Sequence, residues 1–353
     1  MKNFDHVLII GFGGPTKNEE ILPFLRQVAK GRNIPETRLK EVGHHYERVG
    51  GSSPYNGCVF QLAARLKDAL QNQGQPRPVF VGMRNWHPFL HETLAEIKKL
   101  GLKQGIGVIL APYRCEASYE RYIQDVDDAR RTVGSGDWPA PARPSGGRPP
   151  EQAGAEEIHY QYLKPWHDHP LFIQAQADEA RKILDGFSPD ARSETYVLFS
   201  AHSIPLDMPG CAGYQEEILE SCKLVAAGLG VADWSLAYQS RSGGRLDRPP
   251  RPNGPGLGDP AASGRLIRPW LEPDVTLVIK SLAGKGKKRV LIIPIGFLCD
   301  NVEVLYDLDI EAREEAEKCG LQYFRAKTVT DHPKFVAMLQ SLLSESCPVP
   351  NPS

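Results

Sequence analysis

The sequence has no long apolar run. The richest stretch, from Val290 to Leu298, is short and is broken by Pro294 and Gly296, whereas a membrane-spanning helix needs about 20 mainly apolar residues. The first residues, MKNFDHVLIIGFGGP, lack the longer apolar core and the small-residue cleavage site of a signal peptide. We therefore expect a cytoplasmic protein.

The sequence also has almost no net charge and no pattern of paired cysteines. Its 42 Lys and Arg residues nearly balance 43 Asp and Glu residues, so it has no general positive field that would attract nucleic acid, and no nucleic-acid partner is expected. The seven cysteines are scattered and never form C-x-x-C. This pattern favours reduced thiols over a disulfide framework or a structural zinc site.

Short apolar runs alternate with stretches of helical spacing, and this alternation predicts the fold class. The expected strands cover residues 6–12, 78–83, 105–111, 196–201, 234–239 and 289–297. Buried strands that alternate with helices are typical of parallel sheets, which bind ligands at the carboxyl ends of their strands. Because the series occurs twice, we predict an α/β fold of two similar Rossmann-like halves, each a parallel sheet flanked by helices, with a cleft between them.

The chain is long enough for about two domains, which we place at residues 1–160 and 161–353. Two segments rich in Gly and Pro, 134–154 and 243–265, have almost no aliphatic residues and are expected to be surface insertions. A flap over the cleft is the alternative for the second. A C-terminal helix over 333–343 is expected to pack across the joint between the halves.

A glycine-rich loop, GFGGP at 11–15, follows the first expected strand. A dinucleotide fingerprint would need glycine at Thr16, and Pro15 has no amide to donate to a phosphate. Binding of NAD is therefore disfavoured. A structural turn and a loop for a ligand without phosphate both stay open.

The second-half strands end in residues that can carry chemistry. His202 lies in SAHSIP at 200–205, although a lone histidine at a strand end is often structural. After the expected strand at 289–297, Glu303, Asp307 and Glu311 follow at spacings of four, which places them on one ridge of a helix. Asp309 is expected to point elsewhere, so that its replacement leaves activity nearly unchanged.

An acidic ridge is often only a solvated face, but here it begins at the carboxyl end of a buried strand. This position favours cation delivery or a proton relay, since neighbouring carboxylates share protons. If His202 and Glu303 face each other across the cleft, they form an imidazole–carboxylate pair with open coordination positions. Such a pair suits a divalent first-row metal in transit.

Several blocks, in this order along the chain, resemble the signature blocks of the ferrochelatase family, whose members insert ferrous iron into a porphyrin in heme biosynthesis. The first half contributes GFGGP, PFLRQVAKGR at 23–32, HYERVGGSSPYNG at 45–57 and RNWHPF at 84–89. The second half contributes SAHSIP, YQSRSG at 238–243, PWLEPD at 269–274, PIGF at 294–297 and DNVEVLYDLDIEA at 300–312. The resemblance covers nearly the whole chain apart from the two insertions.

This resemblance implies a chelatase-type fold with a porphyrin between the halves, and iron as substrate rather than as a resident cofactor. It assigns the catalytic and metal-binding roles to His202 and Glu303, and the relay of protons or metal to Asp307 and Glu311. The implied porphyrin contacts are Phe12, Tyr46, Ser53 and Tyr122.

Three departures from the family pattern limit the transfer. Asn301 stands where many members have a second histidine, and Phe12 replaces a tyrosine that in some coproporphyrin-type members reaches the metal. The tail after Ala337 holds only Cys347, so the optional iron–sulfur cluster of the family is not expected.

Other functions and partners stay open at this point. The alternatives are a tetrapyrrole or metal carrier without turnover, and a cobalt or nickel chelatase of the same fold. The blocks at 23–32 and 45–57 favour coproporphyrin III over protoporphyrin IX as the substrate. A monomer is expected, and an apolar segment at 21–24 is weighed as a lip for transient contact with a membrane or another heme-pathway enzyme.

Overall fold

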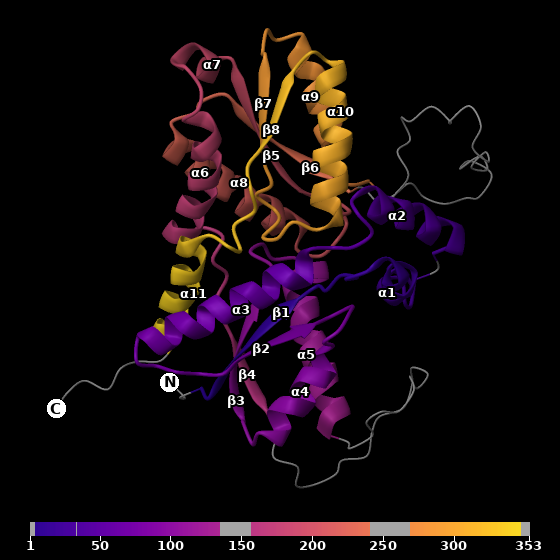
Figure 1. The fold of residues 1–353 in the computed structure, drawn as a ribbon, viewed down its shortest axis with the longest axis vertical. Helices are drawn as coiled ribbons and strands as arrows, with labels where there is room; N and C mark the ends of the chain where they lie inside the picture. Colours follow the sequence, from indigo (N-terminus) through magenta and orange to yellow (C-terminus); the bar gives the residue numbers. More distant parts are fainter. Residues whose placement is uncertain (1–3, 33, 135–156, 241–268, 347–353) are drawn as a thin grey trace, which may run out of the picture.

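The structure is a computed structural model that describes residues 4–32, 34–134, 157–240 and 269–346 (Figure 1). The elements up to the end of the first sheet are β1 (His6–Gly11), the 3-10 helix η1 (Asn18–Glu20), α1 (Ile21–Val28), α2 (Glu36–Arg48), α3 (Tyr55–Asn72), β2 (Val79–Met83), α4 (Leu90–Lys99), β3 (Gln104–Ile109), the π-helix η2 (Glu116–Glu120), α5 (Arg121–Gly134) and β4 (His159–Tyr162).

The second series comprises α6 (Pro170–Leu184), α7 (Pro189–Ser193), β5 (Thr195–His202), α8 (Cys211–Leu229), β6 (Trp234–Gln239), α9 (Val275–Ala283), β7 (Arg289–Ile293), the π-helix η4 (Val304–Ala312), α10 (Arg313–Lys318), β8 (Gln322–Arg325) and α11 (Pro333–Glu345). Apart from Gly134, both expected insertions lie outside the described residues. No helix of the described part of the chain is long and apolar enough to cross a membrane.

The strands form two parallel four-stranded sheets with the same strand order. The order is β2-β1-β3-β4 in the first sheet and β6-β5-β7-β8 in the second. Residues along β1 alternate between two cores: Val7 and Ile9 belong to the cluster that includes α3 residues, while Leu8 and Ile10 belong to the cluster that includes α4 and α5 residues. The predicted α/β fold of two similar halves is confirmed.

The expected strand ends differ from the observed ones where the backbone leaves the ladder. Strand β1 ends at Gly11 because the Phe12 amide donates to the Tyr55 hydroxyl instead of a neighbouring strand. Strand β7 ends at Ile293, since Pro294 has no amide for the ladder. In contrast, β5 extends to His202, which pairs in register with Gln239 of β6.

Sequence reasoning missed the short edge strands β4 and β8. In β3, Gly105 and Gly107 leave space for rings of β4: a Cβ at Gly105 would lie 2.3 Å from the Tyr160 ring, and one at Gly107 would lie 2.5 Å from the Tyr162 ring. Because β4 belongs to the first sheet, the predicted domain boundary at 160/161 falls inside a strand.

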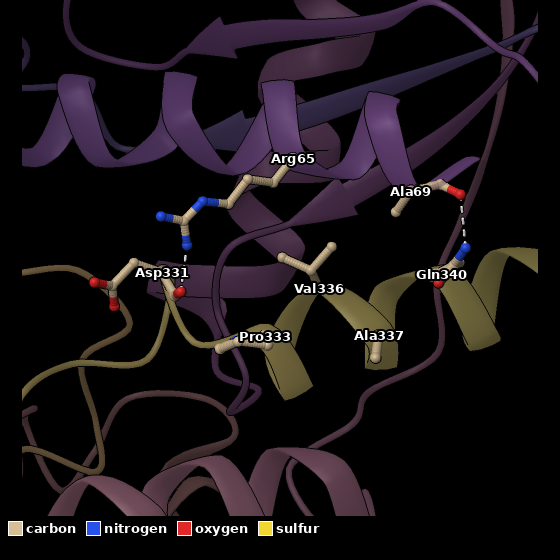
Figure 2. Close-up of a pocket in the computed structure, with 7 residues that line it drawn as sticks. All are labelled: Arg65, Ala69, Asp331, Pro333, Val336, Ala337 and Gln340. Carbon is tan, nitrogen blue, oxygen red and sulfur yellow. Dashed lines mark hydrogen bonds between the residues drawn. The ribbon is translucent and has the colours of Figure 1, made fainter. Parts of the chain in front are cut away.

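Helix α11 lies across the joint between the halves, beside α3 of the first half and α6 (Figure 1). The Gln340 side chain donates to the Ala69 carbonyl of α3 at 2.8 Å, and Lys334 forms an ion pair with Asp178 of α6 at 2.6 Å. Figure 2 shows a shallow surface hollow between α3 and α11, where Arg65 also donates to the Asp331 carbonyl.

We predict that Gly107→Ala destabilises the protein, because the added methyl group would overlap the Tyr162 ring. Overpacking of this kind costs about 1–3 kcal/mol. The matched control is Gly57→Ala at an exposed position of α3, where nothing lies within 4 Å of the added Cβ and a gain of about 0.5–1 kcal/mol is expected. Urea unfolding of both variants measures this, and equal stability of the two would contradict the proposed packing of β4 on β3.

Candidate active site

The strand order defines where a ligand would bind in each half. In a doubly wound sheet, the connections that follow the two central strands leave in opposite directions. Ligands bind at the carboxyl ends of these two strands. In the second sheet these strands are β5 and β7, so His202 at the end of β5 and Glu303 in the segment after β7 lie at this point. Phe12 follows β1, which is the equivalent strand of the first sheet.

The glycine-rich loop after β1 is held by protein groups. The Phe12 amide donates to the Tyr55 hydroxyl at 3.0 Å, and the Gly14 amide donates to the Asn56 side chain at 2.9 Å. A Cβ at Gly14 would lie 2.9 Å from the Ser53 Cβ, so glycine is needed for close packing there. These two amides are used within the fold, which agrees with the absence of a dinucleotide fingerprint.

The imidazole of His202 has a defined orientation. Its Nδ1 lies 2.6 Å from the Ser203 carbonyl oxygen, and since a carbonyl only accepts hydrogen bonds, Nδ1 carries a proton. In the neutral ring the lone pair is then on Nε2. This nitrogen makes no hydrogen bond with the described residues, which leaves it able to bind a metal ion or accept a proton.

Gln239 connects the end of β5 to Glu303. Its side-chain oxygen accepts a hydrogen bond from the Ser200 hydroxyl at 2.5 Å, and its Nε2 donates to the Glu303 carbonyl at 2.9 Å. Gln239 is also the register partner of His202. One buried amide therefore positions the backbone of Glu303 beside the strand that carries His202.

The acidic residues lie on and next to a π-helix. Glu303 is the N-cap of η4, and Asp307 and Glu311 lie within it. All three are only partly exposed, so they do not form a fully solvated face. Asp307 accepts a hydrogen bond from the hydroxyl of Ser240, a residue in the left-handed region at φ 61°. Non-glycine residues in that region are uncommon. Turns of π-helix are rare in proteins and frequently lie at functional sites.

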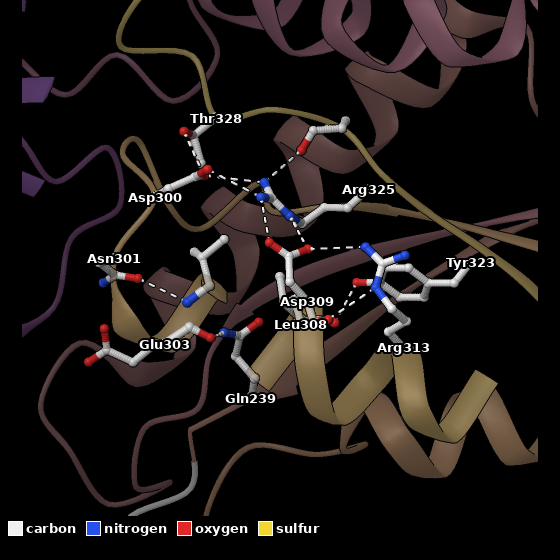
Figure 3. Close-up of polar contacts among 12 residues, drawn as sticks. Gln239, Asp300, Asn301, Glu303, Leu308, Asp309, Arg313, Tyr323, Arg325 and Thr328 are labelled. Atoms are coloured by element: carbon white, nitrogen blue, oxygen red, sulfur yellow. Dashed lines mark hydrogen bonds and ion pairs between the residues drawn. The ribbon is translucent and has the colours of Figure 1, made fainter. Parts of the chain in front are cut away.

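Asn301 has a structural contact in this chain. Its side-chain oxygen accepts a hydrogen bond from the Val304 amide at 3.0 Å, next to the start of η4 (Figure 3). An amide at this position satisfies one of the unpaired backbone donors at a helix N-terminus. Figure 3 also shows that the Glu303 carboxylate points away from the ion pairs formed by Asp300 and Asp309.

Arg325, at the end of β8, joins the loop before Glu303 to the π-helix. Its guanidinium bonds to both oxygens of Asp309 at 2.7 Å and to both oxygens of Asp300 at 3.2 Å. Thr328 donates to the same Asp300 carboxylate at 3.0 Å. The Arg325 side chain is 11% exposed, so this is a largely buried ion-pair network. Asp309 points away from Glu303, as expected, but it has a structural role.

Aromatic side chains of the first half pack against the π-helix region. The Phe24 ring meets Phe12, Tyr46 and Trp86 edge-on, at centroid distances of 6.0 to 6.3 Å. Tyr46 and Phe24 share an apolar cluster with Tyr306 of η4. Of the predicted porphyrin contacts, Phe12 and Tyr46 thus belong to one aromatic group.

The charge of Glu303 reaches phenols of the first half. Burial raises the pKa of the Tyr46 phenol well above its ordinary value, and the Glu303 carboxylate raises it further. For Tyr122 on α5, burial raises the pKa most, and the charges of Asp125 and Glu303 add to this although Arg84 opposes them. Both phenols are therefore within the electrostatic influence of Glu303 and stay uncharged.

Two further residues need separate description. Ser53 is buried, and its hydroxyl accepts a hydrogen bond from the Tyr55 amide at 3.3 Å. Its own amide donates to the Pro15 carbonyl at 2.8 Å, so its observed contacts support the loop after β1. Tyr55 was missed as a site residue: burial raises the pKa of its phenol most, and Tyr122, Cys299 and Glu303 contribute. Gln239 was also missed, although its place at a strand end was a usable signal.

A second group of possible metal ligands lies outside this site. His167, Asp168 and Glu220 hold one ligand atom each within 4.8 Å of one another. Both carboxylates are exposed, and exposed groups of this kind are common without a bound ion.

Comparison with solved structures identifies the class of fold. The chain is similar to SirB from Bacillus subtilis with Fe³⁺, with a TM-score of 0.53 and 12% identity over 97% of this chain and 94% of that one. It is also similar to CbiX, the terminal enzyme for biosynthesis of siroheme in denitrifying bacteria, with a TM-score of 0.50, 12% identity, and coverage of 97% and 100%. The fold is therefore of the chelatase type.

Comparison of sequences identifies the family. The ferrochelatase family model matches residues 5–247 and 262–347. The chain is 34% identical to the coproporphyrin III ferrochelatase of Nocardia farcinica, over 96% of this chain and 87% of the relative. It is 35% identical to the ferrochelatase of Rhodopirellula baltica, over 97% and 86%. The chain belongs to the ferrochelatase family.

We predict that Asp309→Ala lowers the stability of the protein, because it removes two charge-assisted hydrogen bonds from Arg325. Hydrogen bonds to charged groups contribute about 1.5–3 kcal/mol, and a loss of about this size is expected because Arg325 keeps its ion pair with Asp300. Asp128→Ala is the control, since its ion pair with Arg131 is exposed and should contribute little. Denaturant unfolding tests this, and equal effects of the two changes would show that the Arg325 network does not stabilise the fold.

Proposed function

We propose that this protein inserts ferrous iron into a porphyrin in heme biosynthesis, with His202 and Glu303 as the catalytic and metal-binding pair. The observation that carries the proposal is the convergence of both halves on Glu303. Gln239 ties the Glu303 backbone to the strand that carries His202, and the charge of Glu303 reaches Tyr46 and Tyr122 of the other half. Membership of the ferrochelatase family supports the same reaction.

Metal insertion requires two pyrrole protons to leave the macrocycle and the nitrogen lone pairs to tilt toward the ion. The lone pair on Nε2 of His202 accepts pyrrole protons and contacts the metal, and Glu303 shares the proton and the cation with it. Asp307 and Glu311 extend from Glu303 along the π-helix. They relay protons or a hydrated cation, because neighbouring carboxylates exchange both readily.

Aromatic and uncharged groups hold the porphyrin ring. Phe12 and Tyr46 supply apolar surface for a flat macrocycle, and Tyr122 supplies a buried ring near the same carboxylate. Binding energy from the ring periphery can bend the macrocycle toward the geometry of the transition state. Ser53 is proposed as a further porphyrin contact, because it supports the loop after β1.

The favoured substrate is coproporphyrin III. Two observations support it: the blocks at 23–32 and 45–57 resemble those of bacterial members, and the relatives from Nocardia farcinica and Mycobacterium tuberculosis carry the name coproporphyrin III ferrochelatase. Coproporphyrin has four carboxylates, whereas protoporphyrin has two, so recognition of the extra pair determines specificity.

We further propose a cytoplasmic monomer that holds no iron–sulfur cluster. The sequence after Ala337 has only Cys347 as a thiol ligand. Ile21 and Phe24 are 4% and 2% exposed and belong to the core, whereas Leu22 is partly exposed and Pro23 is exposed. Transient contact with a membrane or with another heme-pathway enzyme stays part of the proposal.

Replacement of the catalytic pair tests the reaction. We predict that His202→Ala and Glu303→Gln each lower the rate of metal insertion by about 100-fold or more, the usual contribution of a positioned acid or base. His44→Ala, an exposed histidine paired with Glu47, is the control and should retain activity. The absorbance of the metalloporphyrin measures the rate with iron or zinc, and unchanged rates in both variants would remove the assignment.

Side-by-side turnover of the two porphyrins tests the substrate. One charge-assisted hydrogen bond contributes about 1.5–3 kcal/mol, so kcat/KM for coproporphyrin III should exceed that for protoporphyrin IX by about tenfold or more. Equal values, or a preference for protoporphyrin, would contradict the proposal. Stoichiometric porphyrin binding without any product would instead indicate a carrier.

A further inference from the structure

The peptide group between His202 and Ser203 is held on both sides by other elements of the second half. The Tyr214 hydroxyl of α8 donates a hydrogen bond to the His202 carbonyl at 3.0 Å. The Ser203 amide donates to the Gln239 carbonyl of β6 at 2.8 Å. Tyr214 is 6% exposed, and burial raises the pKa of its phenol well above the ordinary value, so the phenol keeps the proton that it donates. The plane of this peptide group is therefore fixed.

The carbonyl of Ser203 is the group that orients the imidazole, and Ser203 itself is held by its side chain. The carbonyl oxygen lies 2.6 Å from Nδ1 of His202. The Ser203 hydroxyl donates to the Leu271 carbonyl at 2.9 Å, and Ser203 is 1% exposed. Because the hydroxyl has a buried backbone partner, Ser203 cannot turn without leaving that partner unpaired, which is costly in a buried position.

Leu271 belongs to a segment that runs antiparallel to the chain after Ser203. Its amide donates to the Ile204 carbonyl at 2.9 Å, and Pro205 and Trp270 form an antiparallel bridge. The contact of the Ser203 hydroxyl is therefore one of several bonds between the two segments. Ser203 is held by a paired backbone rather than by a single loop residue.

These contacts control which ring nitrogen of His202 carries the proton. Nδ1 can donate only while the Ser203 carbonyl points at it, and a histidine that binds metal usually has its tautomer and ring orientation fixed by such a bond. If either peptide group turned, the ring could rotate and exchange tautomers. The lone pair would then leave Nε2, the nitrogen that has no hydrogen bond with the described residues.

We propose that Tyr214 and Ser203 are positioning residues for His202, because their hydroxyl groups hold the two peptide groups that keep Nδ1 protonated and the Nε2 lone pair directed at the substrate. Both hydroxyls donate to backbone carbonyls, so they act on the reaction through His202. The catalytic part of this assignment rests on the proposed function, whereas the tautomer can be measured without it.

Two other hydroxyls provide matched controls. Tyr119 is 9% exposed and donates to the Leu163 carbonyl of the first half at 2.7 Å. Ser221 is 0% exposed and donates to the His167 carbonyl at 2.7 Å. Tyr119→Phe and Ser221→Ala therefore remove the same atoms from similarly buried positions, and neither residue contacts His202.

The first experiment measures the tautomer without using activity. The protein is labelled with isotope-enriched histidine, and NMR records the ring nitrogens in alkaline buffer, where histidine rings are neutral. The His202 signals are those absent from His202→Ala. We expect protonation at Nδ1 in the wild type and in both controls, and a mixture of tautomers in Tyr214→Phe and in Ser203→Ala. Protonation at Nε2 in the wild type would overturn the proposal, and a variant that keeps the Nδ1 proton fully would remove its residue from the assignment.

The second experiment measures the insertion of zinc into coproporphyrin III. Tyr214→Phe and Ser203→Ala should each lower kcat by about tenfold, as expected when a group that orients a metal-binding histidine is lost. The KM for the porphyrin should stay within about twofold, since neither hydroxyl binds the ring. Tyr119→Phe and Ser221→Ala should keep both constants.

Two kinetic results would overturn the positioning role: equal losses of kcat in the variants and their controls, or a higher KM with an unchanged kcat. A different result would concern the proposed function alone. A wild-type protein that carries the proton on Nδ1 of His202 but inserts no metal would contradict that function, and the tautomer result would still support the positioning of His202 by Tyr214 and Ser203.

Discussion

The site depends on the hydrogen bonds of one buried amide. Gln239 accepts from Ser200 of β5 and donates to the carbonyl of Glu303, while its backbone pairs in register with His202. The Gly296 amide also donates to the Ser200 carbonyl at 3.1 Å, so several hydrogen bonds together link the strand that bears His202 to the segment that carries Glu303. An unpaired amide in so buried a position would also be costly, so folding and positioning reinforce each other here.

The π-helix around Leu308 is held by two side chains of β8. Tyr323 donates to the Leu308 carbonyl at 2.7 Å, and Arg325 holds the helix to the preceding loop through Asp309 and Asp300. These contacts lie on the side away from the Glu303 carboxylate (Figure 3). These contacts therefore support the acidic ridge on the side opposite the Glu303 carboxylate, so that Glu303 is able to act on a substrate between the halves.

The sequence predicts the central strands and the candidate site residues better than it predicts the contacts between the two halves. Central strands such as β1 are continuous apolar runs and could be recognised, whereas β4 is a short, half-exposed edge strand that depends on the absent side chains of Gly105 and Gly107. His202 and Glu303 could be predicted as a candidate pair because they lie at or after the ends of strands and resemble a family pattern. The apolar cluster that joins Tyr46 to Tyr306 of the other half was not predicted, since no local pattern encodes a meeting of two halves.

The most direct test of the shared site is the position of a bound metal ion. Crystals of the protein soaked with zinc would locate the ion by anomalous scattering. We predict zinc at about 2.0–2.2 Å from Nε2 of His202 and a carboxylate oxygen of Glu303. Zinc bound only at the surface group of His167, Asp168 and Glu220, with none near His202, would contradict the central claim.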